Sequence, residues 1–397
     1  MGVQGEARTI GVYLHVPFCL RKCPYCDFKS VARPVLSEAE EGAYADALIK
    51  ELSSVIEREG LSNRPLETIY FGGGTPTLLA PSVIKRLTGS VRGAFAECGT
   101  KGPEITIEAN PDTVSLERLK GYREAGVTRI SIGAQSLDER ILGALGRTHT
   151  AGRAVTAFKE AREAGFENIG LDLIFGVPGQ SIRDWEESVA GVLALLPEHI
   201  SLYGLTLEEG TEFSRAYKDT KRLPDEDDVA QMYESAVRAL KDAGYRHYEI
   251  SNWARPGYES VHNSRYWRVK DYIGCGVGAH SFLSFPEWGR RWWNTPSLEE
   301  YIEGVSAKGS AVKGMETLTR EEAVLESMVL GLRMLEEGIK GEGFKERFGL
   351  YPKEVFPATG ALLRDGLMAS IGEDLSLTRK GAILSDAVFL KMLSQMA

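Results

Sequence analysis

The stretch Cys19-Leu20-Arg21-Lys22-Cys23-Pro24-Tyr25-Cys26 follows directly on the apolar run Val12–Val16. Cys19, Cys23 and Cys26 come just past the end of an expected strand, so their three thiols can turn toward one point. Thiolates are the usual ligands of iron–sulfur clusters, and a cubane normally takes four of them. No fourth thiol follows, and Cys98 and Cys275 lie far away in the sequence. We therefore expect a [4Fe-4S] cluster with one iron open to a small molecule.

Three alternatives exist for these thiols: a structural zinc site, a disulfide framework and a chance cluster. Structural zinc usually takes four protein ligands in two separated pairs, and the sequence shows no second pair at that spacing. A disulfide framework does not suit an odd number of cysteines in a long chain that lacks a signal peptide. A chance cluster of three cysteines stays open at this point.

The spacing Cys-x3-Cys-x2-Cys after a first strand resembles the signature of the radical S-adenosylmethionine (SAM) enzymes. In that family the open iron chelates the methionine end of SAM, and reduction of the cluster cleaves SAM to a 5′-deoxyadenosyl radical. The resemblance implies a family but no particular reaction.

Length and composition set the outer bounds. With 397 residues the chain can form a barrel of roughly 200 to 250 residues plus a smaller unit. Neither a signal peptide nor an apolar run of about 18 residues is recognisable, so we expect a cytoplasmic protein without a transmembrane segment. The net charge of −9 argues against nucleic acid as a partner, because phosphate-binding sites need clustered Lys and Arg.

Short β-rich runs alternate with helical patterns through the first two-thirds of the chain. Such alternation requires a parallel sheet with right-handed crossovers. Six β–α units fall short of a closed eight-fold barrel, so the sequence predicts an open, partial (β/α)6 barrel. The expected strands are Val12–Val16, Thr68–Phe71, Ile105–Glu108, Arg129–Ile132, Ile169–Phe175 and His199–Leu205.

We divide the chain into three parts. Residues 1–240 form the barrel with the cluster, residues 241–312 an aromatic-rich connecting region that completes the site, and residues 313–397 a smaller, mainly helical domain. In the last part, the capping box Thr319-Arg320-Glu321-Glu322 predicts a helix through Met334. This part resembles a winged-helix unit, but it has no strong basic patch, so a covering or docking role is expected rather than DNA binding.

Polar residues stand at the carboxyl ends of the expected strands, where parallel sheets place their ligands. The run Gly72-Gly73-Gly74-Thr75-Pro76-Thr77 leaves backbone N–H groups free to meet a carboxylate or an amine, although a glycine run alone is more often a turn. Asp172 lies inside an apolar strand, where an acid is costly unless it is paired or binds a ligand. A structural ion pair is the alternative for Asp172.

The same positions resemble, in order, the coproporphyrinogen oxidase-like branch of the radical SAM family. That branch contains both an oxygen-independent oxidase and a group of heme chaperones. The resemblance implies that Tyr13, Gly73 and Glu108 contact the SAM on the cluster. It implies that a second nucleoside-like ligand, a second SAM in the oxidase, contacts Gly74, Thr75, Gln135, Arg147 and Asp172.

Two departures separate this chain from the oxidase. The oxidase carries another cysteine two residues after the third ligand, where this chain has Phe28. It also has a long segment ahead of the first strand, whereas here that strand is expected near residue 11. Both features resemble the heme chaperones and place porphyrinogen decarboxylation in doubt.

The connecting region holds the predicted heme site. The run His262-Asn263-Ser264-Arg265-Tyr266-Trp267 resembles a motif associated with heme binding in those chaperones, and imidazole is a common axial ligand of heme iron. We predict His262 as the ligand, with His280 as its competitor and a satisfied core histidine as the alternative. Arg290 and Arg291 are hypothesised to receive the heme propionates.

The sequence therefore predicts a protein that binds heme as cargo and delivers it to apo-hemoproteins such as respiratory enzymes, and that carries a [4Fe-4S] cluster and SAM. The family resemblance implies a reductant such as flavodoxin or ferredoxin, and peripheral membrane contact stays open. The alternatives are an oxygen-independent coproporphyrinogen III oxidase or related radical SAM enzyme, and an interaction protein whose cluster only stabilises the fold. No catalytic residue is assigned.

Overall fold

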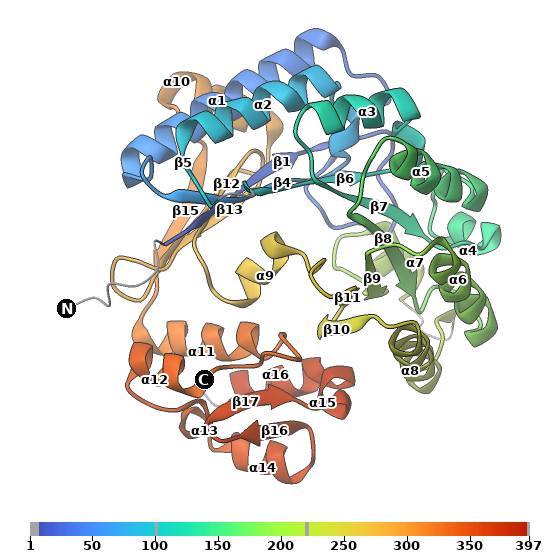
Figure 1. The fold of residues 1–397 in the computed structure, drawn as a ribbon, viewed down its shortest axis with the longest axis vertical. Helices are drawn as coiled ribbons and strands as arrows, with labels where there is room; N and C mark the ends of the chain where they lie inside the picture. Colours follow the sequence, from blue (N-terminus) through green and yellow to red (C-terminus); the bar gives the residue numbers. More distant parts are fainter. Residues whose placement is uncertain (1–7, 100–101, 219–221, 395–397) are drawn as a thin grey trace.

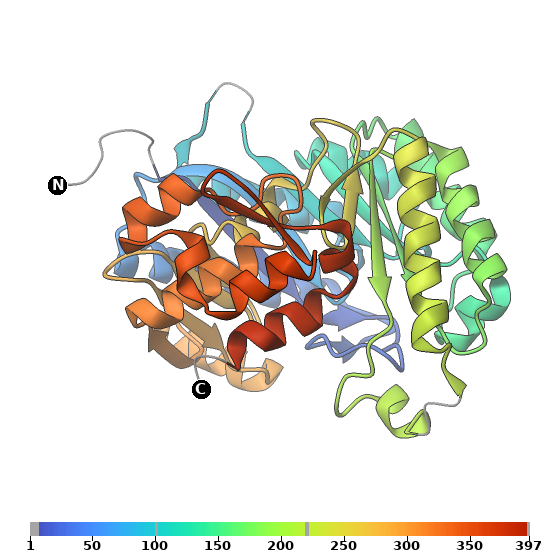
Figure 2. The ribbon, with the colours of Figure 1, turned by 90° about the horizontal axis from the view of Figure 1, so that it is seen from below.

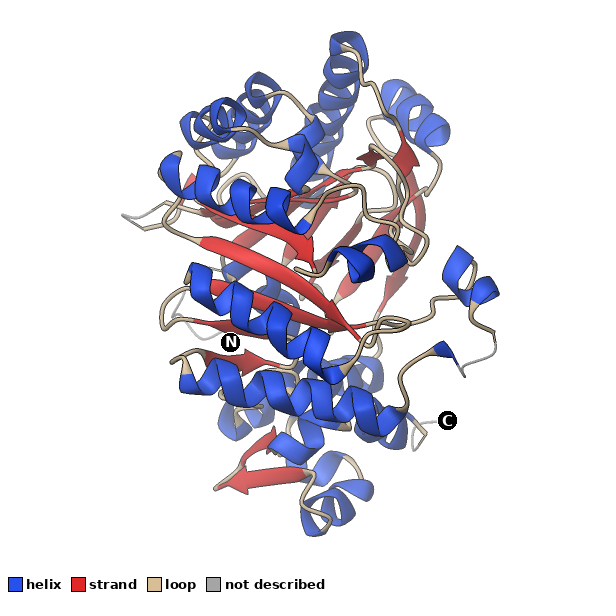
Figure 3. Cartoon of the chain, turned by 90° about the vertical axis from the view of Figure 1, so that its right-hand side faces the viewer, coloured by secondary structure: helices blue, strands red, loops and turns tan. Residues whose placement is uncertain are grey.

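The computed structural model describes residues 8–99, 102–218 and 222–394. Its main element is a sheet of 13 strands, in the order β10-β11-β9-β8-β7-β6-β4-β1-β12-β13-β14-β15, with β5 (Ala96–Glu97) beside β4. The sheet curves as an arch, and most helices lie on its convex side (Figure 1; helices blue and strands red in Figure 3). Among the described residues, no helix has the length and apolar character needed to span a membrane.

Six neighbouring strands of the arch run parallel and alternate in the sequence with helices. This arrangement confirms the predicted partial barrel of six β–α units. The strands are β1 (Ile10–Val16), β4 (Pro65–Gly73), β6 (Glu104–Ala109), β7 (Arg129–Gln135), β8 (Ile169–Phe175) and β9 (His199–Gly204).

Most helices of the barrel begin at side-chain caps, whereas α2 (Pro81–Ala94) begins with Pro81 after Ala80 and has no side-chain cap. In the first helix of the barrel, the Ser37 hydroxyl accepts from the Glu40 N–H while the Glu40 carboxylate accepts from the Ser37 N–H, and the helix ends at Gly60, whose φ is 65°. The helices are α1 (Glu38–Glu59), α2 (Pro81–Ala94), α3 (Leu116–Glu124), α4 (Glu139–Ala144), α5 (Ala151–Glu163), α6 (Ile182–Leu195), α7 (Glu212–Ala216) and α8 (Glu226–Asp242), with short 3₁₀ turns η1 (Pro76–Leu78) and η2 (Pro111–Thr113).

The connecting region extends the sheet at both edges. At one edge β11 pairs antiparallel with β9, and at the other β12 pairs parallel with β1 and leads into an antiparallel ribbon of three strands. A helix, α9, lies inside the arch (Figure 1). The elements are β10 (Arg246–Glu249), β11 (Asn252–Ala254), α9 (Val261–Trp267), β12 (Tyr272–Cys275), β13 (His280–Leu283), β14 (Arg290–Asn294), α10 (Leu298–Lys308) and β15 (Val312–Thr317).

The C-terminal elements lie across the open side of the arch (Figures 1 and 2). They pack around a second apolar cluster that includes Phe344 and Leu362 and draws Phe282 from the sheet. The elements are α11 (Arg320–Gly331), α12 (Gly341–Phe348), α13 (Pro352–Val355), α14 (Ala358–Arg364), β16 (Met368–Ile371), β17 (Asp374–Leu377), α15 (Arg379–Ile383) and α16 (Ser385–Leu393).

The predicted capping box of α11 is present, but the helix ends at Gly331 and does not reach Met334. The chain leaves the helix there to pair with the barrel: Leu335 N–H donates to Tyr248 O at 3.0 Å, and Ile250 N–H donates to Arg333 O at 3.2 Å. Hydrogen bonds to a distant strand thus replace the last helical turn.

Candidate functional site

A cavity of about 560 Å³ opens at the carboxyl ends of the parallel strands. Parallel strands direct these ends to one edge of the sheet, so residues that are far apart in the sequence meet there. Of the predicted cluster and SAM residues, Tyr13 alone does not line the cavity. The lining includes Cys19, Cys23, Cys26, Gly73, Gly74, Thr75, Glu108, Gln135, Arg147 and Asp172.

The cysteine loop is closed by short backbone pairing. β2 (Phe18–Cys19) runs parallel to β3 (Val31–Ala32), and Arg33 N–H donates to Cys19 O at 2.7 Å. Within the loop, Cys26 N–H donates to Cys23 O at 3.1 Å, which turns these two residues toward the same side. All five cysteines are free thiols in the structure.

The groups around the thiols suit an anionic sulfur cluster. The Thr75 hydroxyl donates to Cys19 Sγ at 3.6 Å, and the Arg147 guanidinium donates to Cys23 Sγ at 3.5 Å. A Cβ on Gly74 would lie 3.0 Å from Cys19 Sγ, so this position must be glycine for the loops to approach. Burial raises the pKa of the Cys19 thiol, so iron binding must displace its proton.

Among the described residues, no three His, Cys, Asp or Glu side chains come close enough together to share a single metal ion. A cubane does not require this, because each of its thiolate ligands binds a different iron. The three sulfurs at one cavity mouth therefore fit a multi-iron cluster better than a single zinc ion.

Glu108 is fixed at the cavity wall by donors from β4. Its carboxylate accepts a hydrogen bond from the Tyr70 hydroxyl at 2.8 Å and one from the Gly73 N–H at 3.1 Å. Burial, with a smaller contribution from the charge of Asp172, raises the pKa of Glu108 to about 7, against the opposite effect of the two hydrogen bonds and of the Arg129 charge. A cationic ammonium at this wall would favour the ionised carboxylate.

Three more polar residues line the cavity: Gln135 at the end of β7, Asp172 in β8, and Arg147 in the loop after α4. Asp172 accepts a hydrogen bond from the Ser131 hydroxyl at 3.1 Å, and burial raises the pKa of its carboxyl group. No arginine or lysine forms an ion pair with Asp172 within the described part of the chain. Gln135 ends β7 with a φ of 64°, a backbone conformation that is uncommon outside glycine and clusters at functional sites.

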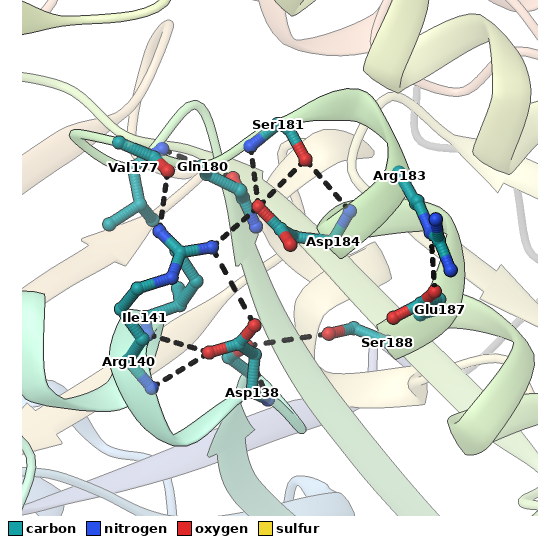
Figure 4. A network of polar contacts seen from close by, with 12 residues as sticks. Asp138, Arg140, Ile141, Val177, Gln180, Ser181, Arg183, Asp184, Glu187 and Ser188 are labelled. Carbon is teal, nitrogen blue, oxygen red and sulfur yellow. Dashed lines mark hydrogen bonds and ion pairs between the residues drawn. The ribbon is translucent and has the colours of Figure 1, made fainter.

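The loops around this edge are held by ion pairs. The Arg140 guanidinium lies between Asp138 and Asp184, and it donates to Gly179 O at 2.6 Å and to Asp184 at 2.6 Å (Figure 4). The segment that follows Gln135 and the loop that follows β8 are thereby tied to each other.

Tyr13 lies within the barrel, in a row of stacked rings. Its ring is 6.1 Å from that of Tyr70 with an interplanar angle of 27°, and Tyr70 is 4.9 Å from the ring of His262 at the same angle. The Tyr13 hydroxyl bonds His15 Nδ1 at 3.0 Å, and His15 Nε2 bonds Lys29 O at 2.8 Å. Tyr13 therefore links the barrel interior to the loop that follows Cys26.

His262, the predicted heme ligand, lies in the barrel interior and is 1% exposed. Its Nδ1 bonds the Thr68 hydroxyl at 2.7 Å, and its Nε2 bonds the Tyr266 hydroxyl at 2.8 Å. The N–H groups of Val261 and His262, at the start of α9, donate to the Glu104 carboxylate. With both ring nitrogens bonded and the ring buried, His262 offers no nitrogen to a heme iron in this conformation.

The arginines hypothesised to receive propionates are already paired. Arg290 forms an ion pair with Glu59 of α1, and Arg291 pairs with Glu316 of β15 and Glu326 of α11. These carboxylates neutralise both guanidinium groups. The pairs tie the sheet to α1 on one face and to the C-terminal elements on the other.

Two tyrosines that shape the site were missed from the sequence: Tyr203 lines the cavity, and Tyr70 bonds a residue of its wall. Tyr70 holds Glu108, and Tyr203 at the end of β9 lines the cavity with 42% of its surface exposed. Both lie in expected strands, where only every second residue points inward. Counting back two residues from Gly72 in β4 would have placed Tyr70 on the same face of the strand as Gly72. That inference needs to know which face of the strand points into the barrel, and the sequence did not provide this.

Comparison with known proteins gives the family. Residues 13–190 match the Radical SAM superfamily, and residues 318–384 match the HemN C-terminal domain. The "Heme chaperone HemW" of Bacillus subtilis is 36% identical over 386 residues, covering 97% of this chain and 99% of the relative. HemW of Escherichia coli is 40% identical over 278 residues, covering 70% of this chain and 71% of that relative.

A solved structure shares the whole fold. Coproporphyrinogen III oxidase (HemN) from Escherichia coli, described as a radical SAM enzyme, matches with a TM-score of 0.81 over 97% of this chain and 90% of its own, at 23% identity. At that identity the match concerns the fold alone. The chain therefore belongs to the radical SAM superfamily, in the coproporphyrinogen III oxidase-like branch that also contains the heme chaperones HemW.

Proposed function

We propose that this protein is a heme chaperone of the HemW type, which binds heme and delivers it to apo-hemoproteins. The observation that carries the proposal is the similarity to curated heme chaperones, at 36% and 37% identity over 97% of this chain. Phe28 supports it, because the oxidase has a cysteine at this position. Phe28 is 65% exposed at the cavity mouth, so an apolar side chain replaces a potential ligand there.

The proposal includes a [4Fe-4S] cluster on Cys19, Cys23 and Cys26 with SAM at the open iron, which together supply one-electron chemistry when bound. The Gly73–Glu108 wall would hold the SAM amino group, since a carboxylate accepts its N–H groups. Tyr13 would support this wall through its contact with Tyr70. The partners proposed are apo-hemoproteins such as respiratory enzymes, and a reductant such as flavodoxin or ferredoxin.

A second set of residues would contact the rest of SAM or a second nucleoside-like ligand. Hydroxyl, amide, guanidinium and carboxylate groups face one cavity and can bond ribose and base edges. The set consists of Gly74, Thr75, Gln135, Arg147 and Asp172.

The complete set of SAM-type residues favours one rival function, that of an oxygen-independent coproporphyrinogen III oxidase or a related radical SAM enzyme. In that case the SAM-derived radical would abstract hydrogen from propionate carbons of the substrate. The same cavity serves both functions, so its geometry does not separate them.

One anaerobic preparation with the cluster reconstituted separates the two functions. We expect stoichiometric heme binding, transfer of that heme to an apo-hemoprotein such as apomyoglobin, and no decarboxylation of coproporphyrinogen III. A matched preparation of the coproporphyrinogen III oxidase provides the positive control for decarboxylation. Decarboxylation that consumes SAM, without specific heme binding, would replace the chaperone with the oxidase.

A further inference from the structure

We propose that the segment following the last cysteine is the docking surface for an acidic protein that carries single electrons and reduces the cluster. This inference rests on the cluster in the proposed function and adds the place where its electron donor binds. The segment covers residues 28–35, and four of its side chains form the surface: Phe28, Lys29, Arg33 and Val35. We call this surface the basic face.

Backbone hydrogen bonds join the basic face to two of the three cysteines. Arg33 N–H donates to Cys19 O at 2.7 Å, because β3 runs parallel to β2 in a short ladder. Phe28 N–H donates to the thiol of Cys26. The rate of electron transfer falls steeply with distance, so a donor must bind where few atoms separate it from the thiols. The basic face meets this condition.

The cysteine loop is basic although the protein as a whole is acidic. Residues 20–36 contain one acidic side chain, Asp27, whereas the whole chain has a net charge of −9. The basic side chains of the same residues are Arg21, Lys22, Lys29 and Arg33. An acidic partner is therefore repelled by the net charge of the protein and attracted by this loop.

The two cations of the basic face are only weakly paired. The ammonium of Lys29 lies 3.9 Å from the Asp27 carboxylate, and the Lys29 side chain is 54% exposed. Arg33 Nε lies 4.0 Å from the Glu40 carboxylate. Exposed pairs at such distances contribute little, so both cations can pair with carboxylates of a partner.

Two exposed apolar side chains lie next to these charges in the segment. Phe28 is 65% exposed, and Val35 is 81% exposed. An aromatic contact surrounded by charged groups is the usual composition of a small protein–protein interface. Complexes of electron carriers belong to this class, because they bury little area and depend on charge complementarity.

A partner on the basic face leaves the SAM cavity accessible. Lys29, Arg33 and Val35 do not line the cavity, and Phe28 alone of the basic face does so. Elsewhere on the rim the exposed carboxylates of Glu208 and Glu209 repel an acidic partner. The electron carrier and SAM can therefore be bound at the same time.

The step at this surface is the transfer of one electron from the reduced carrier to the cluster on the three thiolates. The carrier is oxidised by one electron, and no bond forms or breaks. An anionic lipid surface would meet the same cations, but lipid binding does not require a position beside Cys19 and Cys26. An electron carrier accounts for both the charge and the position.

The test measures how a flavodoxin, as the acidic one-electron carrier, binds to the anaerobic, cluster-reconstituted full chain. The double variant Lys29→Glu with Arg33→Glu reverses both cations and leaves every cavity-lining residue in place. We expect its Kd for flavodoxin to rise about tenfold or more, and the wild-type Kd to rise with ionic strength because salt screens exposed charges.

Two further measurements show that the cluster of this variant is intact. Reduction by flavodoxin, followed by electron paramagnetic resonance, should slow in the double variant. Reduction by a small photochemical reductant should keep the wild-type rate, and the Kd for SAM should stay within about twofold of the wild-type value. Both substituted side chains are partly exposed, so the variant should fold.

A matched control reverses two exposed lysines far along other helices, Lys159 of α5 and Lys241 of α8. The double variant Lys159→Glu with Lys241→Glu changes the net charge by the same amount. Its Kd for flavodoxin should stay within about twofold of the wild-type value. Titration with vesicles that contain phosphatidylglycerol tests the lipid alternative.

Equal affinity for flavodoxin in the wild type and in Lys29→Glu with Arg33→Glu, or equal losses in both double variants, would overturn the inference. Binding of the vesicles in place of flavodoxin, lost in the first variant, would replace the carrier with a lipid surface. A wild type that holds no iron and sulfide would overturn both the inference and the cluster in the proposed function. Failure to bind or transfer heme, with flavodoxin binding as expected, would count against the chaperone function alone.

Discussion

Glu108 shows how single contacts set the chemistry of the cavity. The carboxylate has two donors from one strand, and it faces a second carboxylate, Asp172, that raises its pKa. Two acids in one cavity are costly in the empty protein, and the charge of the buried Arg129 acts against the raised pKa of both carboxyl groups without cancelling the effect of burial. A ligand that carries an ammonium group removes part of that cost, so the site is arranged to favour a cation.

The first prediction concerns Glu108→Gln. Burial raises the pKa of Glu108 to about 7, so wild-type affinity for SAM should rise as the pH increases through 7 and the carboxylate ionises. The glutamine variant should bind SAM about tenfold more weakly at pH 8, since a neutral amide oxygen accepts the N–H groups of the SAM amino group less strongly than a carboxylate does. Calorimetric titration from pH 6 to pH 8 measures this.

Any titration of SAM itself affects the wild type and the variant equally. The difference between the two pH profiles therefore reports Glu108 alone. Its heme titration should match that of the wild type, which controls for folding. Parallel pH profiles in the two proteins would show that Glu108 does not contact the SAM amino group.

At the scale of elements, α9 closes the interior of the arch. Its first N–H groups bind Glu104 of β6, and Arg265 donates to Asp271 O at 2.6 Å and pairs with Glu67 of β4. A Cβ on Gly11 of β1 would lie 2.8 Å from Arg265 Nε, so the helix packs tightly against the strand. The aromatic and basic motif of this region therefore stabilises the barrel in this conformation.

The glycine loop after β4 supplies the second prediction. Gly73 has a φ of 111°, and a Cβ there would enter the ring of His15. Gly73→Ala should lower the free energy of unfolding by roughly 1–3 kcal/mol through backbone strain, and it should weaken SAM binding because the N–H donor to Glu108 moves. Chemical denaturation and calorimetry measure the two effects.

Gly89 is the matched control. It lies exposed within α2, and a Cβ there meets nothing within 4 Å. Gly89→Ala should raise stability by roughly 0.5–1 kcal/mol, since alanine loses less backbone entropy in a helix. Equal effects of the two substitutions would contradict the strain assigned to Gly73.

At the scale of the whole molecule, the chain forms two apolar cores joined through the sheet. The larger core fills the space between the strands and the helices of the barrel and takes in Trp292, and the smaller core belongs to the C-terminal elements and includes Phe282 of β13. The ribbon of β13, β14 and β15 thus contributes to both cores. Its position depends on strand pairing and not on the cysteine loop.

The third prediction follows from this separation of the ribbon from the cysteine loop. A variant with Cys19→Ala, Cys23→Ala and Cys26→Ala should lose the cluster and bind SAM at least tenfold more weakly, because no open iron remains. Its Kd for heme should stay within about twofold of the wild-type value, since strand pairing and not the cluster positions the sheet outside the cysteine loop. Iron and sulfide analysis, together with the two titrations, measures this.

A triple variant that is folded by circular dichroism yet has lost heme binding would contradict the separation. The corresponding control replaces Cys98, which lies outside both sites, and should change neither titration.

The sequence alone determined the cluster motif, the alternation of strands and helices, and the residues at the strand ends. These features depend on local spacing: three cysteines on one loop, periods of 2 and 3.6, and the meeting of parallel strand ends at one edge. For the same reason the residues predicted for SAM, from Gly73 to Asp172, line a single cavity.

The tertiary structure alone decided which side chains remain available to a ligand. His262 bonds Thr68, which lies 194 residues earlier, and Arg290 pairs with Glu59 from another element. Trp293 and His280 are neighbours only through strand register. Whether a side chain is available to a ligand depends on its burial and on contacts between distant segments, and no local pattern encodes these. A local motif therefore identified His262, whereas the fold buries its ring and exposes that of His280.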